Sequence, residues 1–158
     1  MKFEHLVQVN DPLNPLIEPM TRAQLWQGLL LRAEQPAAFM TNLTGSRIVV
    51  RGDLSLAREL DFGSFKVRDR VRLEPMRRIM IETEATQDRG VGMLTISIEE
   101  PGAALLQMRF DYQLERTRLE DAAQEAMYDQ FIRSAYLEAD IDCVRIIRQR
   151  ASEESWVP

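Results

Sequence analysis

Hydrophobic and polar positions alternate through most of the middle of this chain, most regularly over residues 54–74, LSLARELDFGSFKVRDRVRLE. A period of two is typical of strands, so this stretch predicts two strands joined by a turn. Gly63-Ser64 lies between them. Glycine at the first position of a two-residue loop favours a type II′ hairpin turn, and such a loop fixes how the two strands align.

The predicted alignment places apolar residues opposite apolar residues: Phe62 with Phe65, Leu60 with Val67, and Leu56 with Val71. It also places opposite charges together: Asp61 with Lys66, Glu59 with Arg68, and Arg58 with Asp69. Complementary cross-strand pairs support the alignment, since like charges directly opposite each other are unfavourable. Arg58 and Asp69 share the face of the apolar residues. They predict either a buried ion pair or the polar floor of a cavity.

The same periodicities predict the other elements: strands over 3–9, 46–51, 78–83, 93–99 and 106–115, short helices over 21–34 and 36–40, and a long helix over 119–150. Val49 interrupts the alternation in its strand. Turns are expected at 87–90 and 100–102. Residues 151–158 carry no periodicity and predict a flexible tail after a single domain over 1–150.

This order predicts an α+β fold with a seven-stranded, curved antiparallel sheet around a long C-terminal helix. The first strand is expected to pair with the last, and the two short helices to close one end. The helix should bury its apolar stripe against the concave face; the stripe comprises Tyr128, Phe131, Ile132, Ala135, Tyr136, Ala139, Cys143, Ile146 and Ile147. A curved sheet over one helix tends to leave a pocket, and a pocket is the usual place for a ligand.

Composition narrows the function. The 158 residues carry a net charge of −5, which argues against nucleic acid as a partner because phosphate binding needs a basic surface. No apolar run is long enough to span a membrane, and the N-terminus lacks a signal-peptide core. With one cysteine, Cys143, and one histidine, His5, neither a disulfide framework nor a Cys/His metal spacing exists. We expect a cytoplasmic protein without a cofactor, although a carboxylate-only metal site stays open.

Local strings carry a family resemblance. Residues 9–39 contain Asn10-Asp11-Pro12, then Thr21-Arg22-Ala23-Gln24-Leu25-Trp26, then Arg32-Ala33-Glu34-Gln35-Pro36. This region, together with the hairpin over 57–71, resembles the AtaL-like family of the START-like (SRPBCC, Bet v 1-like) superfamily. The resemblance implies the helix-grip fold, a hydrophobic ligand cavity and a loose kinship with polyketide cyclases and aromatases. It implies no catalytic residues.

The periodicity places certain side chains on the inner face of the fold, and these are the candidate ligand-binding residues: His5, Arg58, Asp69, Leu106, Met108, Phe110, Tyr112, Tyr128 and Ile132. Ile96 is expected to be a further apolar wall of the cavity. Arg58 could bind an anionic or phenolic group as a fork donor, or pair with Asp69 for structure alone. His5 could act as a general base near neutral pH, or be a core histidine with a backbone partner. The tyrosines could face the cavity or simply belong to the core.

Three functions fit these residues. The first is binding of a small hydrophobic or aromatic ligand in the cavity. The second is a cyclase- or aromatase-like enzyme in which His5, Asp69 or a tyrosine moves protons. The third is a structural or interaction module with a filled core, which a cavity below about 300 Å³ would favour. Met80 and Met93 have outward parity and could mark a homodimer surface.

Overall fold

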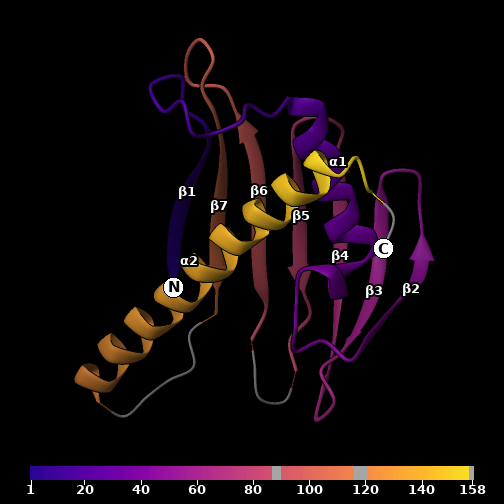
Figure 1. The fold of residues 1–158 in the computed structure, drawn as a ribbon. Helices are drawn as coiled ribbons and strands as arrows, with labels where there is room; N and C mark the ends of the chain where they lie inside the picture. Colours follow the sequence, from indigo (N-terminus) through magenta and orange to yellow (C-terminus); the bar gives the residue numbers. More distant parts are fainter. Residues whose placement is uncertain (87–89, 116–120, 157–158) are drawn as a thin grey trace.

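The computed structural model describes residues 1–86, 90–115 and 121–156, and Figure 1 shows the fold. The elements follow in this order: β1 (Lys2–Asn10), α1 (Arg22–Glu34), the 3₁₀ helix η1 (Pro36–Ala38), β2 (Gly45–Arg51), β3 (Ser55–Asp61), β4 (Lys66–Glu74), β5 (Arg78–Thr83), β6 (Gly92–Glu99), β7 (Leu106–Leu114) and α2 (Ala122–Ser152). The turn predicted at 87–90 lies largely outside the described residues.

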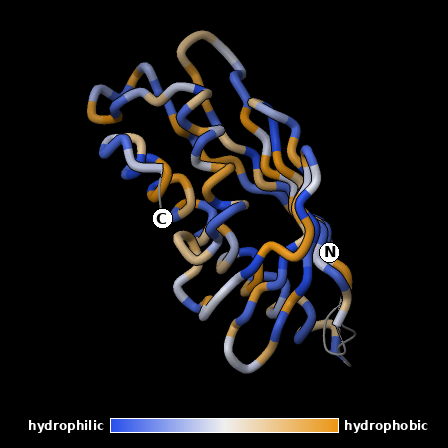
Figure 2. The backbone as a smooth tube through the Cα atoms, turned by 90° about the vertical axis from the view of Figure 1, so that its right-hand side faces the viewer, coloured by the Kyte–Doolittle hydropathy of each residue, from blue (hydrophilic) through white to orange (hydrophobic). Residues whose placement is uncertain are grey.

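The strands form one antiparallel sheet in the order β1-β7-β6-β5-β4-β3-β2. The predicted α+β helix-grip architecture is confirmed, including the pairing of the first strand with the last. Both helices lie on one face of the sheet, and Figure 2 shows the two layers from the side. Inward side chains of the strands contribute to the main core or to a smaller cluster at Leu43, Leu60 and Val67, and β2 contributes the partly buried Ile48.

The β3–β4 hairpin has the predicted register. Arg58 lies opposite Asp69, and the backbone N–H of Phe62 donates to the carbonyl of Phe65 across the turn at 2.9 Å. Gly63 has φ of 90°, which a glycine adopts without steric cost. All three predicted charge pairs are cross-strand neighbours, but the side chains of Asp61 and Lys66 make other contacts. Asp61 accepts a hydrogen bond from the Gly63 N–H, whereas the ammonium group of Lys66 lies 3.8 Å from Glu59.

The interruption at Val49 is a bulge. The β2–β3 register shifts between Ile48 and Val50, so that Val49 is the extra residue. A bulge bends a strand and increases its twist, and bulges are frequent at sheet edges. The break in alternation therefore had a structural cause.

A capping box begins α1, because the Thr21 side chain accepts from the Gln24 N–H and the Gln24 side chain accepts from the Thr21 N–H. The preceding loop is fixed by Asn10, whose side-chain amide bonds both the N–H and the carbonyl of Met20. The second predicted helix is shorter than expected and forms only the 3₁₀ turn η1.

The long helix α2 differs from its prediction in which part it buries. Its fully buried residues all lie in the second half: Asp140, Cys143, Val144, Ile147 and Ala151. The first half projects beyond the edge of the sheet (Figure 1), so Phe131 is 69% exposed. We call residues 122–139 the overhang. Neither helix of the described chain has an apolar stretch suited to crossing a bilayer.

The end of α2 is tied to the body of the protein. The helix continues to Ser152, Ala151 is buried, and Trp156 packs against the main core. Arg148 donates to the carbonyls of Glu18 and Val9, at 2.7 and 2.6 Å, so it joins α2 to β1 and to the loop before α1. Flexibility of the tail over 151–158 stays a prediction.

Candidate functional site

Arg58 and Asp69 form a buried, two-pronged ion pair on the inner face. The guanidinium Nε donates to Oδ1 at 2.8 Å and Nη2 donates to Oδ2 at 2.6 Å, and each residue is 3% exposed. The remaining nitrogen, Nη1, donates to the carbonyls of Ala33 and Arg32 at 3.0 and 3.4 Å. These carbonyls belong to the last turn of α1.

All three guanidinium nitrogens of Arg58 therefore already have protein partners. The residue closes the C-terminal end of α1, where helix carbonyls lack partners within the helix, and joins it to the sheet. A ligand anion would have to displace these contacts. Of the two roles open to Arg58, the contacts favour the structural pair over the ligand anchor.

A second polar cluster lies where α2 crosses β1 and β7. Asp140 of α2 is 2% exposed. Its Oδ1 accepts a hydrogen bond from the Tyr112 hydroxyl at 2.6 Å, and its Oδ2 lies 3.0 Å from Nδ1 of His5. His5 stands on β1 and Tyr112 on β7, so three elements supply one side chain each. We call these three residues the acid cluster.

The acid cluster shifts the ionisation of its members. Burial raises the pKa of Asp140, although the hydrogen bonds from Tyr112 and His5 oppose part of that shift. Burial and the neighbouring carboxylate raise the pKa of the Tyr112 hydroxyl, so this hydroxyl stays a donor at all ordinary pH values. Burial also raises the pKa of the nearby Cys143 thiol to about 11, so Cys143 is no nucleophile at neutral pH.

The geometry leaves one nitrogen of His5 open. When Asp140 is ionised, Nδ1 carries the proton and donates to it, and Nε2 is then an acceptor. Within the described residues, Nε2 has no hydrogen-bond partner, and no buried side-chain nitrogen or oxygen lacks one. Nε2 therefore reaches solvent. An imidazole oriented by a buried carboxylate, with its other nitrogen accessible, can accept a proton or a hydrogen bond.

Aromatic rings surround the acid cluster. Tyr112 stacks between Phe3 and Tyr136, with ring centroids 4.8 and 4.7 Å apart. His5 lies 5.4 Å from Phe3, and the Arg133 guanidinium lies 5.7 Å from the centroid of the same ring. Phe3 and Tyr112 belong to the sheet, whereas Tyr136 and Arg133 belong to the overhang. The overhang thus begins directly above this aromatic group.

The apolar residues predicted to line a cavity are packed against one another. Ile96, Met108 and Phe110 are 0% exposed and Leu106 is 3% exposed, so no water-sized void borders the first three. Ile132 packs against this core from the overhang. Tyr128 lies apart from the others, since it is 47% exposed on the overhang. The fold brings His5 and Tyr112 together and leaves Arg58 and Asp69 farther along the sheet.

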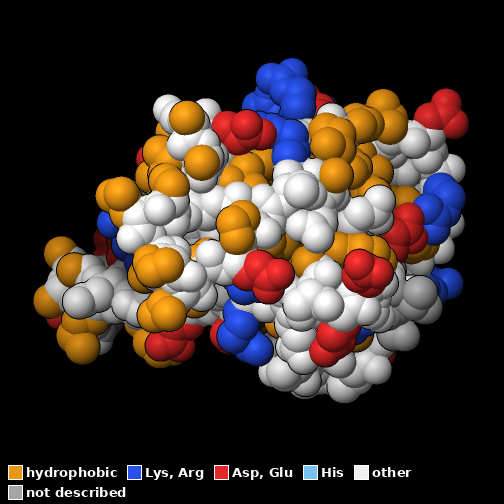
Figure 3. Space-filling model, turned by 45° about the horizontal axis from the view of Figure 1, so that its top comes forward, with side chains coloured by type: hydrophobic (Ala, Val, Ile, Leu, Met, Phe, Trp, Pro, Cys, Tyr) orange, Lys and Arg blue, Asp and Glu red, His pale blue; other side chains and the backbone are white. Residues whose placement is uncertain are grey.

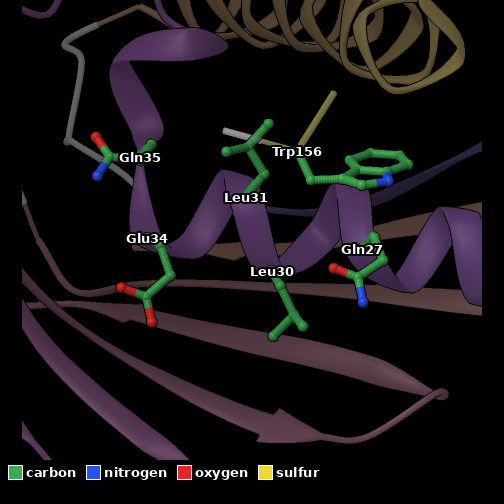
Figure 4. A pocket seen from close by; sticks show the side chains of 6 residues that line it. All are labelled: Gln27, Leu30, Leu31, Glu34, Gln35 and Trp156. Carbon is green, nitrogen blue, oxygen red and sulfur yellow. The ribbon is translucent and has the colours of Figure 1, made fainter. Parts of the chain in front are cut away.

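Two hollows stand out in the described part of the chain, and neither lies between the sheet and α2. One, of about 210 Å³, lies on α1 beside Trp156 (Figure 4). The other, of about 510 Å³, lies on the opposite, outer face of the sheet. The overhang meanwhile presents apolar side chains to solvent, with Met127 72% exposed, and Figure 3 shows hydrophobic groups on this projecting end.

Asp140 is the functional candidate that the sequence pattern did not reveal. A signal was present, because the positions four before and three, four and seven after it are Tyr136, Cys143, Val144 and Ile147. Those positions share one helix face with residue 140. An acidic residue at the centre of an apolar face predicts a buried, partnered carboxylate.

Comparison with known proteins gives a family and a fold. Residues 7–154 match the family described as acetylaranotin biosynthesis cluster protein L, AtaL. No curated protein matches the chain. Among solved structures, the Zhui aromatase/cyclase from Streptomyces sp. R1128 superposes with a TM-score of 0.66 at 17% identity, over 95% of this chain and 94% of that one.

Two further structures share the fold. The di-domain ARO/CYC StfQ from the steffimycin biosynthetic pathway has a TM-score of 0.70 at 12% identity, covering 99% of this chain and 52% of that one. A START superfamily protein from Mycobacterium smegmatis has a TM-score of 0.56 at 10% identity, over 91% and 97% of the two chains. The family match and the shared helix-grip fold agree with the motifs in residues 9–39. The chain belongs to the AtaL family.

Proposed function

We propose that the protein binds a small hydrophobic or aromatic molecule between the sheet and the overhang, with Nε2 of His5 as its polar anchor. The observation that carries the proposal is the acid cluster. It places a solvent-accessible ring nitrogen beside stacked aromatic rings, at the point where α2 leaves the sheet. Solved structures of the same fold include proteins described as aromatase/cyclases, which supports an aromatic or polyketide-like ligand.

The packed core restricts where such a ligand can enter. Around Phe110 no space exists, so binding at the core would require repacking of many side chains. At the overhang, Ile132 and Tyr136 are only partly buried. A ligand that displaces these two side chains gains apolar contacts on the sheet side and leaves the core intact.

The test uses two neutral aromatic probes, 1-naphthol and naphthalene, titrated by fluorescence. His5→Asn keeps a donor near Asp140 and removes Nε2. It should weaken 1-naphthol binding by about 0.5–1.5 kcal/mol, the net contribution of one hydrogen bond, and leave naphthalene binding unchanged. Equal loss for both probes would show that His5 is not the polar anchor.

The position is tested by adding bulk on the overhang. Ile132 packs against the core, so Ile132→Trp should fill the proposed site and prevent binding of both probes. Leu137→Trp is the matched control, because Leu137 is 38% exposed on the same part of α2. Native mass spectrometry of protein purified from its source would identify what co-purifies. If no probe binds and nothing co-purifies, the protein is a structural module.

A cyclase- or aromatase-like enzyme is the second candidate, and one observation favours it. A carboxylate–imidazole pair with an accessible Nε2 is the arrangement that a general base needs. In that case His5→Asn should abolish turnover. The turnover rate of the wild type should depend on pH, because the imidazole must be unprotonated to accept a proton. A pH-independent rate in the wild type would exclude His5 as the base.

A further inference from the structure

The outer face of the sheet carries a groove that the acid cluster does not share. Its volume is about 510 Å³, within the usual range for small-molecule sites. Its border combines apolar side chains, Val50, Ala57, Met80 and Met93, with two guanidinium groups, Arg70 and Arg72, and one carboxylate, Glu82. The groove lies on the face that neither helix covers.

The strand register explains why the surface is hollow here. Val50, Ala57, Arg70, Glu82 and Met93 are successive cross-strand neighbours, so they form one row over β2, β3, β4, β5 and β6. At about 4.8 Å between strands, this row is about 19 Å long. Ala57 is the smallest member and stands beside the long side chain of Arg70. The depression follows from this difference in side-chain length.

The charge along β4 is unusual for an acidic protein. Four successive outward positions are cationic, Lys66, Arg68, Arg70 and Arg72, in a chain whose net charge is −5. The first two lie 3.8 and 3.5 Å from the carboxylate of Glu59.

The two arginines at the groove differ from this pair. The side chains of Arg70 and Arg72 make no hydrogen bond or ion pair with any described residue, and both are exposed. Arg72 is close enough to Glu74 to help lower the pKa of that carboxyl. Glu82 stands across from Arg70 in the register but forms no ion pair with it. The groove is therefore bordered by two guanidinium groups whose donors the protein itself does not use.

We infer that this groove binds a small anionic molecule with an apolar body, such as a fatty or aromatic carboxylate. Arg70 and Arg72 hold the anionic group, because a guanidinium offers paired donors that match a carboxylate. Ala57, Met80 and Met93 contact the apolar body, and methionine adapts its shape to varied ligands. The site is separate from the one proposed at His5 and takes a ligand of different charge.

Other occupants fit less well. A two-fold contact with a second copy would bring the β4 arginines towards their own symmetry mates, and like charges repel. Two unpaired cations in a concave groove are too few for nucleic acid, which binds through many phosphate contacts. A small anion satisfies both guanidinium groups at once.

The experiment is calorimetric titration with dodecanoate, compared with neutral dodecanol, on the full chain. The double variant Arg70→Gln with Arg72→Gln should weaken dodecanoate binding by about ten- to a hundredfold, as expected for lost charge-assisted hydrogen bonds. The matched control is Lys66→Gln with Arg68→Gln, which removes the same charge from the same strand outside the groove. It should change the affinity less than threefold. Ala57→Phe, which fills the hollow, should abolish binding.

Several results would overturn the inference. Equal losses in the two double variants would mean a diffuse surface charge and no site. Dodecanol binding as tightly as dodecanoate would exclude the anion requirement. Dodecanoate-induced chemical-shift changes confined to the acid cluster would show that the ligand binds there and not in the groove. A dimer that dissociates on Ala57→Phe would show that the groove is a contact between two copies of the chain. Binding of 1-naphthol should be unaffected by the arginine variants, so failure here is distinguishable from failure at His5.

Discussion

Two buried aspartates on the inner side are stabilised by different partners. Asp69 faces a guanidinium that also binds the end of α1, and the pair is closed to solvent. Asp140 shares its two oxygens between a phenol and an imidazole, and that imidazole reaches solvent through its other nitrogen. At the residue scale, the first carboxylate holds elements together, whereas the second orients an imidazole whose other nitrogen has no protein partner among the described residues.

Arg58→Met should destabilise the fold by about 3–5 kcal/mol, because it leaves the Asp69 carboxylate buried without a partner. Adding Asp69→Leu should recover most but not all of this loss, since the carbonyls of Arg32 and Ala33 still lack their donor. Urea unfolding measures both. Arg51→Met is the matched control: it breaks a similar two-pronged pair with Glu34 at the surface and should destabilise the fold much less than Arg58→Met. Equal costs at the two sites would contradict the structural role.

Asp140→Asn should remove a pH dependence from the stability. Burial raises the folded pKa of Asp140 above its unfolded value, so the folded state binds the proton more tightly. The stability that this group contributes is complete below the unfolded pKa and is lost as pH rises through the folded pKa. The wild type should therefore lose stability relative to the variant as pH rises from the ordinary carboxyl range. The loss is about 1.4 kcal/mol for each unit of difference between the two pKa values.

The control for Asp140 is Asp142→Asn, which removes an exposed carboxylate from the same helix. Its unfolding free energy should stay within about 0.5 kcal/mol of the wild type at each pH. Unfolding in urea between pH 4 and pH 8 measures all three proteins. If the unfolding free energies of the wild type and Asp140→Asn differ by the same amount at every pH in this range, folding does not shift the pKa of the Asp140 carboxyl.

At the element scale, local rules predicted the strands well and the long helix less well. The two-residue loop at Gly63 determined the β3–β4 register, and the irregular Val49 marked the bulge in β2. These features depend on neighbours in the sequence. Which half of α2 is covered depends on where the sheet ends, and the apolar pattern around Phe131 looks the same as that around Ile147. Asp140 was missed for the related reason that its partners, His5 and Tyr112, are more than 25 positions away.

The contact between the two helices depends on Gly28. A Cβ added there would overlap the Ile147 side chain of α2. Gly28→Ala should therefore destabilise the fold, although this change usually stabilises a helix by about 1 kcal/mol. Combined with Ile147→Ala, the total loss should be smaller than the sum of the two single losses, since the overlap is removed. Strict additivity in a thermal or urea double-mutant cycle would show that the helices are not in close contact at this position.

On the scale of the whole molecule, the protein has a dense core and two separate surfaces with distinct chemistry. The inner side ends in an aromatic group and the acid cluster, under a helix that projects past the sheet. The outer side offers a groove bordered by Arg70, Arg72 and Glu82. The sequence predicted the fold and the inward residues because strand parity separates the two faces. It did not predict the filling of the core, which depends on how side chains from many elements fit together.

Phe110→Trp tests that filling. Phe110 is fully buried with no void beside it, so the larger ring should cost about 1–3 kcal/mol of stability. Tyr128→Trp on the overhang is the control and should change stability by no more than about 0.5 kcal/mol. Denaturant unfolding followed by circular dichroism measures both. If Phe110→Trp is as stable as the wild type, the core contains space beside Phe110. A ligand site between the centre of the sheet and α2 would then be favoured.

The overhang also gives α2 the geometry of a lever. Asp140 is its first fully buried residue, and Ala122 lies about 27 Å away along the axis at about 1.5 Å per residue. A tilt of roughly ten degrees at Asp140 moves Ala122 by about 5 Å. Such a tilt would also shift Ile132 and Tyr136, which pack against the core between these two points. The distance between two labels, one near Ala122 and one on β4, would report the state of the acid cluster without any probe bound to it.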